Sequence, residues 1–126
     1  MAIRGIAPYA PMEELKHWVV SGLEQHEDCR WTWRLDPAFR GPTPPGRPAR
    51  LIQPAEVMWR LLPQVRCPTL IVRGAASTML PLDIADQVAA VMPNAHVVSI
   101  RDAGHWTGLD NPTGFVQAVR DFLTNP

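Results

Sequence analysis

The sequence predicts an α/β fold in which two parallel strands carry flanking helices and follow a helical segment. Two short apolar runs, Thr69–Gly74 and Ala95–Ile100, have the length and aliphatic content of buried parallel strands. Apolar residues recur at helical spacing in the stretches 81–92 and 111–123. Strand, helix, strand and helix in this order make a βαβ unit with a further helix, for which we expect a right-handed crossover.

The residues before this unit are expected to contain two helices and an extended connector. The stretch 11–25 is predicted to be helical, because apolar side chains recur on one face: Leu15, Trp18, Val19 and Leu23. The stretch 30–35 is expected to form a short strand or an extended loop. Six prolines between residues 37 and 54 exclude a helix or a central strand there and indicate an extended connector. A short helix is predicted over residues 55–62.

Two parts of the chain are therefore expected, residues 1–54 and residues 55–126. The first combines the helix with the proline-rich connector, and the second holds the βαβ unit and the final helix. That final helix has Pro112 in its first turn and either Asp110 or Asn111 as its N-cap. The preceding stretch, 101–110, is expected to be a loop.

Composition excludes several classes of protein. The 12 basic and 12 acidic residues give a formal net charge of zero, which argues against a nucleic-acid partner. No run of like charges or long apolar stretch indicates a membrane partner, and Met1–Ala10 lacks the apolar core of a secretory signal. Cys29 and Cys67 show neither metal nor redox spacing. We therefore expect a cytoplasmic protein with reduced thiols, no metal and no cofactor, and a single disulfide stays open as an alternative.

The residues from Leu61 onward resemble the end of the α/β-hydrolase family. The resemblance rests on four pieces in a fixed order: 67–74, 92–95, 103–106, and Asn111-Pro112 with the closing helix. In this family the first of the two strands leads to the catalytic acid, and the second leads to the catalytic histidine within a Gly-His dipeptide. The resemblance therefore implies that His105 is the catalytic histidine. Trp106 is expected to be a wall of the substrate pocket, because it comes directly after His105. Residues 1–54 resemble the cap segment of the family.

The family resemblance implies hydrolysis of a small ester, lactone, epoxide or similar molecule. A histidine in this position acts first as general base and then as general acid, for which an imidazole is suited near neutral pH. Gly104 would permit the tight turn that presents the ring at the carboxyl edge of the strands, where open α/β sheets bind their ligands. No cofactor is implied.

The nucleophile elbow of the family is absent from this sequence. The elbow has the pattern Gly-x-Ser-x-Gly, and none of Ser21, Ser77 and Ser99 has glycine two residues away on both sides. Ser77 lies between a strand and a helix, but Met79 stands where the second glycine belongs. In the family the elbow lies well before the cap, so we expect it to precede Met1.

The catalytic acid is also missing from its usual place. Thr78 stands where the family commonly has Asp, and threonine brings no negative charge. Loss of the acid from a serine-protease triad costs about four orders of magnitude in turnover. Asp83 and Asp102 are the remaining candidates for a substitute acid. Because both loops leave the same edge of the sheet, we expect Thr78 to lie near His105.

Two hypotheses about function follow. The chain is either a hydrolase of this family that lacks its nucleophile and is inactive alone, or a non-catalytic remnant of a truncated or split gene that keeps only the fold. In both cases two buried-type strands need further neighbours. We therefore expect self-association or a complementing N-terminal half.

Overall fold

The computed structural model describes residues 2–34 and 55–124, and the chain forms two compact units. One unit combines Met1–Pro11 with Ala55–Pro126, and the other is Met12–Pro54. The division into residues 1–54 and 55–126 stays a prediction, and the first eleven residues group with residues 55–126. The connector predicted over residues 37–54 lies outside the described residues.

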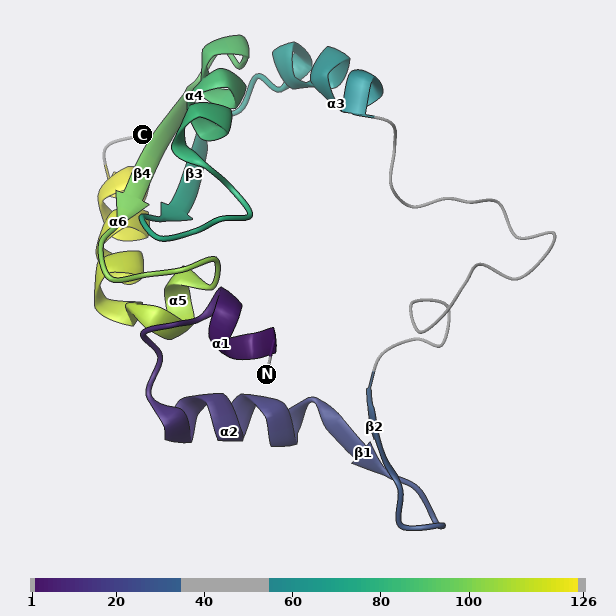
Figure 1. The fold of residues 1–126 in the computed structure, drawn as a ribbon. Coiled ribbons are helices and arrows are strands. Elements are labelled where there is room, and N and C mark those ends of the chain that lie inside the picture. Colours follow the sequence, from purple (N-terminus) through teal and green to yellow (C-terminus); the bar gives the residue numbers. More distant parts are fainter. Residues whose placement is uncertain (1, 35–54, 125–126) are drawn as a thin grey trace, which may run out of the picture. The chain divides into compact units, whose positions relative to one another are not determined.

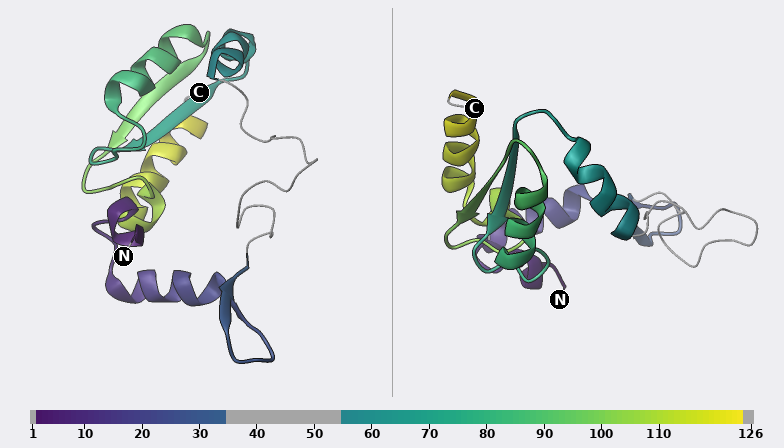
Figure 2. Two further views of the ribbon diagram at one scale, coloured as in Figure 1. Left: turned by 45° about the vertical axis from the view of Figure 1, so that its right-hand side comes forward. Right: turned by 90° about the horizontal axis from the view of Figure 1, so that it is seen from above.

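A parallel pair of strands forms the centre of the larger unit. β3 (Thr69–Gly74) and β4 (Ala95–Ile100) pair in register, from Thr69 opposite Ala95 to Gly74 opposite Ile100. Helix α4 (Leu82–Val91) packs on one face of this pair and α6 (Pro112–Thr124) on the other, as the views in Figures 1 and 2 show together. The predicted α/β fold, with two parallel strands and flanking helices, is confirmed.

Helix α6 begins where proline and asparagine predict it. Asn111 is its cap, because its Oδ1 accepts a hydrogen bond from the Gly114 amide at 2.9 Å. The Nδ2 of the same side chain donates to the Arg101 carbonyl oxygen at 3.0 Å. Of the two candidates for this cap, the structure selects Asn111, which also ties the helix to the loop after β4.

The smaller unit contains a helix and a hairpin. Helix α2 (Met12–Ser21) ends before Gly22, and β1 (Leu23–Gln25) then pairs antiparallel with β2 (Trp31–Trp33). The prediction that the helix continues to residue 25 is therefore wrong. The reason is tertiary pairing, since residues 23–25 form a ladder with β2, and the Trp33 ring lies so close that a Cβ on Gly22 would approach it to 2.9 Å.

Three short elements complete the described chain. Helix α3 (Ala55–Leu61) is confirmed and continues into a 3₁₀ turn, Leu62–Gln64. Helices α1 (Ala2–Ile6) and α5 (Thr107–Asp110) are not predicted by the sequence pattern, and the second replaces part of the expected loop 101–110. Elements of four or five residues are too short to show helical periodicity, which explains why both were missed.

The strands of the larger unit are less buried than their composition indicates. The fully or nearly buried apolar side chains of this unit are Ala7, Ala10, Ala85, Met92, Ile100 and Ala103. Residues 69–72 of β3 remain partly exposed. This partial exposure agrees with the expectation that the two strands need further neighbours, because within the described residues each strand pairs with only one other strand. None of the helices in the described ranges is long and apolar enough to cross a membrane.

Candidate functional site

The candidate site lies at the edge of the sheet where β3 and β4 both end. The Ala75 amide donates to the Ile100 carbonyl oxygen at 2.8 Å, and the Ala76 amide donates to the Ala103 carbonyl oxygen at 2.9 Å. These bonds continue the ladder beyond the strands. The loop after β3 and the loop leading to His105 therefore run side by side, as parallel pairing requires.

Two glycines allow the backbones at this edge to approach each other closely. A Cβ on Gly74 would overlap with the carbonyl oxygens of Ala103 and Gly104. A Cβ on Gly104 would lie 2.5 Å from Cδ of Pro8 and 2.8 Å from the Ile6 carbonyl oxygen. Gly104 is thus needed to make room for an N-terminal segment, which the interpretation of a tight turn did not foresee.

His105 follows Gly104 and is exposed to solvent. Within residues 2–34 and 55–124, no side chain forms a hydrogen bond or an ion pair with its ring. Asp83 and Asp102, the two candidates for a substitute acid, are both exposed, and neither is bonded to the ring. Asp102 instead occupies the turn after β4 with a φ of 49°. No carboxylate among the described residues orients the imidazole.

Arg73 holds the loop in which the family has its acid. This side chain is buried, with 7% of its surface exposed, and its guanidinium donates three hydrogen bonds. Nε donates to the Leu80 carbonyl oxygen at 3.0 Å, Nη1 to Oγ of Ser99 at 2.8 Å, and Nη2 to the Ala75 carbonyl oxygen at 3.3 Å. The two carbonyls lie at the two ends of the loop 75–80, so Arg73 fixes its shape. Sequence analysis did not single out this residue.

Two side chains of the loop 75–80, Ser77 and Thr78, occupy positions relevant to the nucleophile and the acid. Ser77 is buried, and its Oγ accepts a hydrogen bond from the Leu80 amide at 3.3 Å. A serine used in this way closes a turn and is poorly placed to attack a substrate. Thr78, the residue at the expected position of the acid, is exposed.

Asp110 connects the histidine loop to the N-terminal segment. Its Oδ1 accepts hydrogen bonds from the amides of Tyr9 at 2.8 Å and Ala10 at 2.7 Å, and its Oδ2 accepts one from the amide of Gly104 at 2.6 Å. Sequence analysis considered Asp110 only as a helix cap. No local signal in the sequence reveals this role, because the bonds to Tyr9 and Ala10 span about a hundred residues.

Trp106, the expected pocket wall, comes directly after His105. The residue is half-buried, and its amide donates to the Ile6 carbonyl oxygen at 3.1 Å. The described residues contain no group of three or more His, Cys, Asp or Glu side chains that could hold a metal ion. The candidate site therefore consists of one exposed imidazole on a tightly packed backbone.

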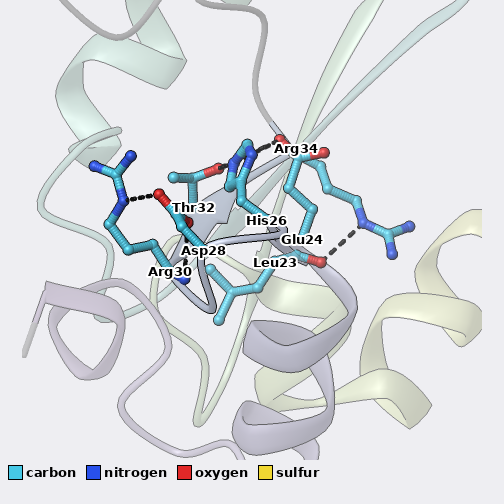
Figure 3. A network of polar contacts seen from close by, with 7 residues as sticks. All are labelled: Leu23, Glu24, His26, Asp28, Arg30, Thr32 and Arg34. Atoms are coloured by element: carbon cyan, nitrogen blue, oxygen red, sulfur yellow. Dashed lines mark hydrogen bonds and ion pairs between the residues drawn. The ribbon is translucent and has the colours of Figure 1, made fainter.

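A second polar cluster among the described residues belongs to the hairpin of the smaller unit (Figure 3). Nε2 of His26 lies 2.7 Å from Oγ1 of Thr32 and 3.8 Å from a carboxylate oxygen of Glu24. Across the hairpin turn, Nε of Arg30 donates to Asp28 at 2.6 Å. These contacts are exposed. His26, next to the end of β1, meets Thr32 of β2, and Asp28 and Arg30 pair within the turn, so the contacts stabilise the turn end of the hairpin.

Comparison with known proteins shows which proteins this chain resembles. No family model matches the sequence. A 2-hydroxy-6-oxononadienedioate/2-hydroxy-6-oxononatrienedioate hydrolase of Cupriavidus pinatubonensis is 31% identical over 64 residues, which are 51% of this chain and 22% of that protein. An sn-1-specific diacylglycerol lipase of Mus musculus is 34% identical over 56 residues, which are 44% of this chain and 18% of the lipase. The chain thus spans about a fifth of the length of these curated relatives.

Solved structures extend the likeness to the fold. An esterase from Mycobacterium tuberculosis matches with a TM-score of 0.75 at 18% identity, over 98% of this chain and 41% of the esterase. An E-2-(acetamidomethylene)succinate hydrolase matches with a TM-score of 0.71 at 18% identity, over 98% of this chain and 43% of that chain. The sequence likeness to hydrolases covers roughly half of this chain, and the chain has the fold of part of an α/β-hydrolase. Nearly all of this chain matches, but it corresponds to less than half of each of these two larger chains.

Proposed function

We propose that this chain carries the histidine end of an α/β-hydrolase site for a small ester, lactone, epoxide or similar substrate, and that it is inactive by itself. His105 would be the general base, and Trp106 would line the substrate pocket. The observation that carries the proposal is the position of His105 in the loop after β4, next to the carboxyl end of β3. This is the edge at which open α/β sheets bind ligands.

The inactivity of the isolated chain follows from two missing groups. No carboxylate among the described residues is bonded to His105, and Ser77 is buried in a turn. In the usual mechanism an acid orients the histidine, and the histidine activates the nucleophile. Without either group the first step of hydrolysis cannot take place in this way. The nucleophile and the donors for the oxyanion would have to come from another chain or from a segment outside this sequence.

A hydrolysis assay with His105→Ala as its matched variant tests the proposal of inactivity. We expect the purified chain and His105→Ala to hydrolyse p-nitrophenyl acetate and p-nitrophenyl butyrate at the same rate, equal to that of buffer. His105 is exposed, so the variant is expected to stay folded. Turnover by the parent chain that survives repurification and disappears in His105→Ala would show that the chain is an enzyme on its own.

A non-catalytic interaction module is the second candidate function. It is favoured by the partly exposed residues 69–72 of β3 and by the single pairing of each strand in the described part of the chain. The DNA upstream of the Met1 codon separates the two candidates. A reading frame there that encodes a nucleophile elbow supports a split hydrolase, whereas its absence supports the module.

A further inference from the structure

Asp110 forms the densest set of hydrogen bonds next to His105. Its two carboxylate oxygens accept three backbone N–H groups, from Tyr9, Ala10 and Gly104, at distances between 2.6 and 2.8 Å. Bonds of this length to an ionised acceptor are charge-assisted and stronger than neutral ones. One side chain thus fastens two segments of backbone to each other.

The N-terminal segment, residues 4–10, reaches the histidine loop at a second point. The amide of Trp106 donates to the Ile6 carbonyl oxygen at 3.1 Å. The residues on both sides of His105 are therefore tied by their amides, Gly104 to Asp110 and Trp106 to Ile6. These two hydrogen bonds restrain the backbone on both sides of His105.

The segment itself is held in shape from within. Nη1 of Arg4 donates to the carbonyl oxygens of Pro8 and Ala10, both at 3.0 Å. Ala7 and Ala10 are buried, with 0% and 1% of their surface exposed. Gly104 lies so close to Pro8 that a Cβ there would approach its Cδ to 2.5 Å. The contact between the segment and the loop is thus packed as well as hydrogen-bonded.

We propose that Asp110 is a positioning residue for His105 and that residues 4–10 form part of the histidine site. The inference rests on the proposed role of His105. Asp110 is not the missing acid, because its oxygens are engaged by three backbone amides and it forms no bond to the ring. It is not the cap of α6 either, because Asn111 fills that position.

The test is a comparison of the full-length chain with Asp110→Asn and Asp102→Asn by NMR. The amide group of Asp110→Asn keeps one acceptor oxygen and turns the other into a donor, so part of the link is lost while the side-chain volume is kept. Asp102→Asn is the matched control, because it makes the same change at an exposed residue in the turn that precedes His105. Two readouts are recorded: amide hydrogen exchange, and the chemical shifts of the His105 ring protons.

In Asp110→Asn, exchange at the amides of Tyr9, Ala10 and Gly104 is expected to accelerate about tenfold or more relative to the strand amides, as loss of a charge-assisted bond implies. The His105 ring signals should shift at the same time, and Asp102→Asn should change neither readout. Equal acceleration across β3 and β4 would reduce Asp110 to a general stabiliser. Unchanged ring signals despite faster local exchange would also overturn the positioning role.

A second variant keeps the proposal testable should Asp110→Asn fail to fold. Arg4→Gln weakens the same segment from its other side without touching the histidine loop. We expect faster exchange at Tyr9 and Ala10 together with a shift of the His105 ring signals. Ring signals identical to those of the parent chain would mean that the segment does not position His105. Neither readout requires turnover, so the outcome is independent of whether the chain hydrolyses a substrate.

Discussion

Gly74 and Gly104 are in direct backbone contact, although thirty positions separate them in the sequence. The end of β3 and the loop that leads to His105 touch so closely that a single methyl group on Gly74 would overlap with the carbonyl oxygens of Ala103 and Gly104. The amide bonds from Ala75 and Ala76 to the same region hold this contact in place. The edge that carries His105 is therefore a rigid backbone junction.

Gly74→Ala is expected to destabilise the larger unit by about 3 kcal/mol or more, at the upper end of overpacking effects. The backbone on both sides would have to separate, because the overlapping atoms belong to main chain and cannot rotate away. Urea denaturation measures the change. Gly5→Ala is the control, because nothing lies within 4 Å of its Cβ and helix α1 should gain from alanine. A Gly74→Ala chain as stable as the parent would contradict the described junction.

Arg73→Met is expected to lower the free energy of unfolding by about 2–3 kcal/mol, because it leaves the acceptors of a charged donor without partners. The carbonyl oxygens of Leu80 and Ala75 and the Ser99 hydroxyl all lose a bond. Methionine retains the length and much of the volume of the side chain. Ser99→Ala removes only one of the three bonds and should cost about 1 kcal/mol. If Arg73→Met lost no more stability in urea than Ser99→Ala, the two bonds from Arg73 to the carbonyl groups of the loop 75–80 would contribute nothing.

Local patterns in the sequence predict the βαβ unit because the information lies within each element. The aliphatic runs of β3 and β4 and the helical spacing in α4 and α6 need no knowledge of the rest of the chain. The helix predicted up to residue 25 fails for the opposite reason. Leu23 continues the apolar face of α2, and only pairing with Trp33 across the hairpin turns it into a strand residue.

The sequence predicts only those residues of the candidate site that match the motifs of the family. The Gly-His dipeptide predicts His105 as the histidine of the site, and Thr78 stands where the resemblance leads one to expect the acid. Asp110 could not be identified, because its partners Tyr9 and Ala10 lie about a hundred residues away. Arg73 was missed because a charged residue inside an apolar run gives no sign of the carbonyl groups it will meet.

The chain is expected to self-associate in solution. Each strand of the parallel pair has one partner among the described residues, and apolar surface left in water costs about 25 cal/mol per Å². Light scattering after gel filtration should give a mass above 14.0 kDa that rises with concentration. Leu123→Lys distinguishes association through α6, where Leu123 is 70% exposed, from association through strand edges. A monodisperse 14.0 kDa species with a cooperative melt would contradict this prediction.

Thr78 and His105 are expected to be neighbours, as their loops leave the same edge of the parallel pair. The Ala76 amide bonds to the Ala103 carbonyl oxygen, so residues two positions further along each loop begin from adjacent backbone. Both side chains are exposed, and Arg73 restrains the loop of Thr78 while Asp110 restrains that of His105. A nuclear Overhauser contact between the Thr78 methyl group and the His105 ring protons would demonstrate the pairing. The Thr113 methyl group, on α6, should give no such contact and is the internal control. Absence of the Thr78 contact in a chain whose strand amides are protected would mean that the acid and histidine positions have moved apart, and that restoring a carboxylate by Thr78→Asp could not rebuild the pair.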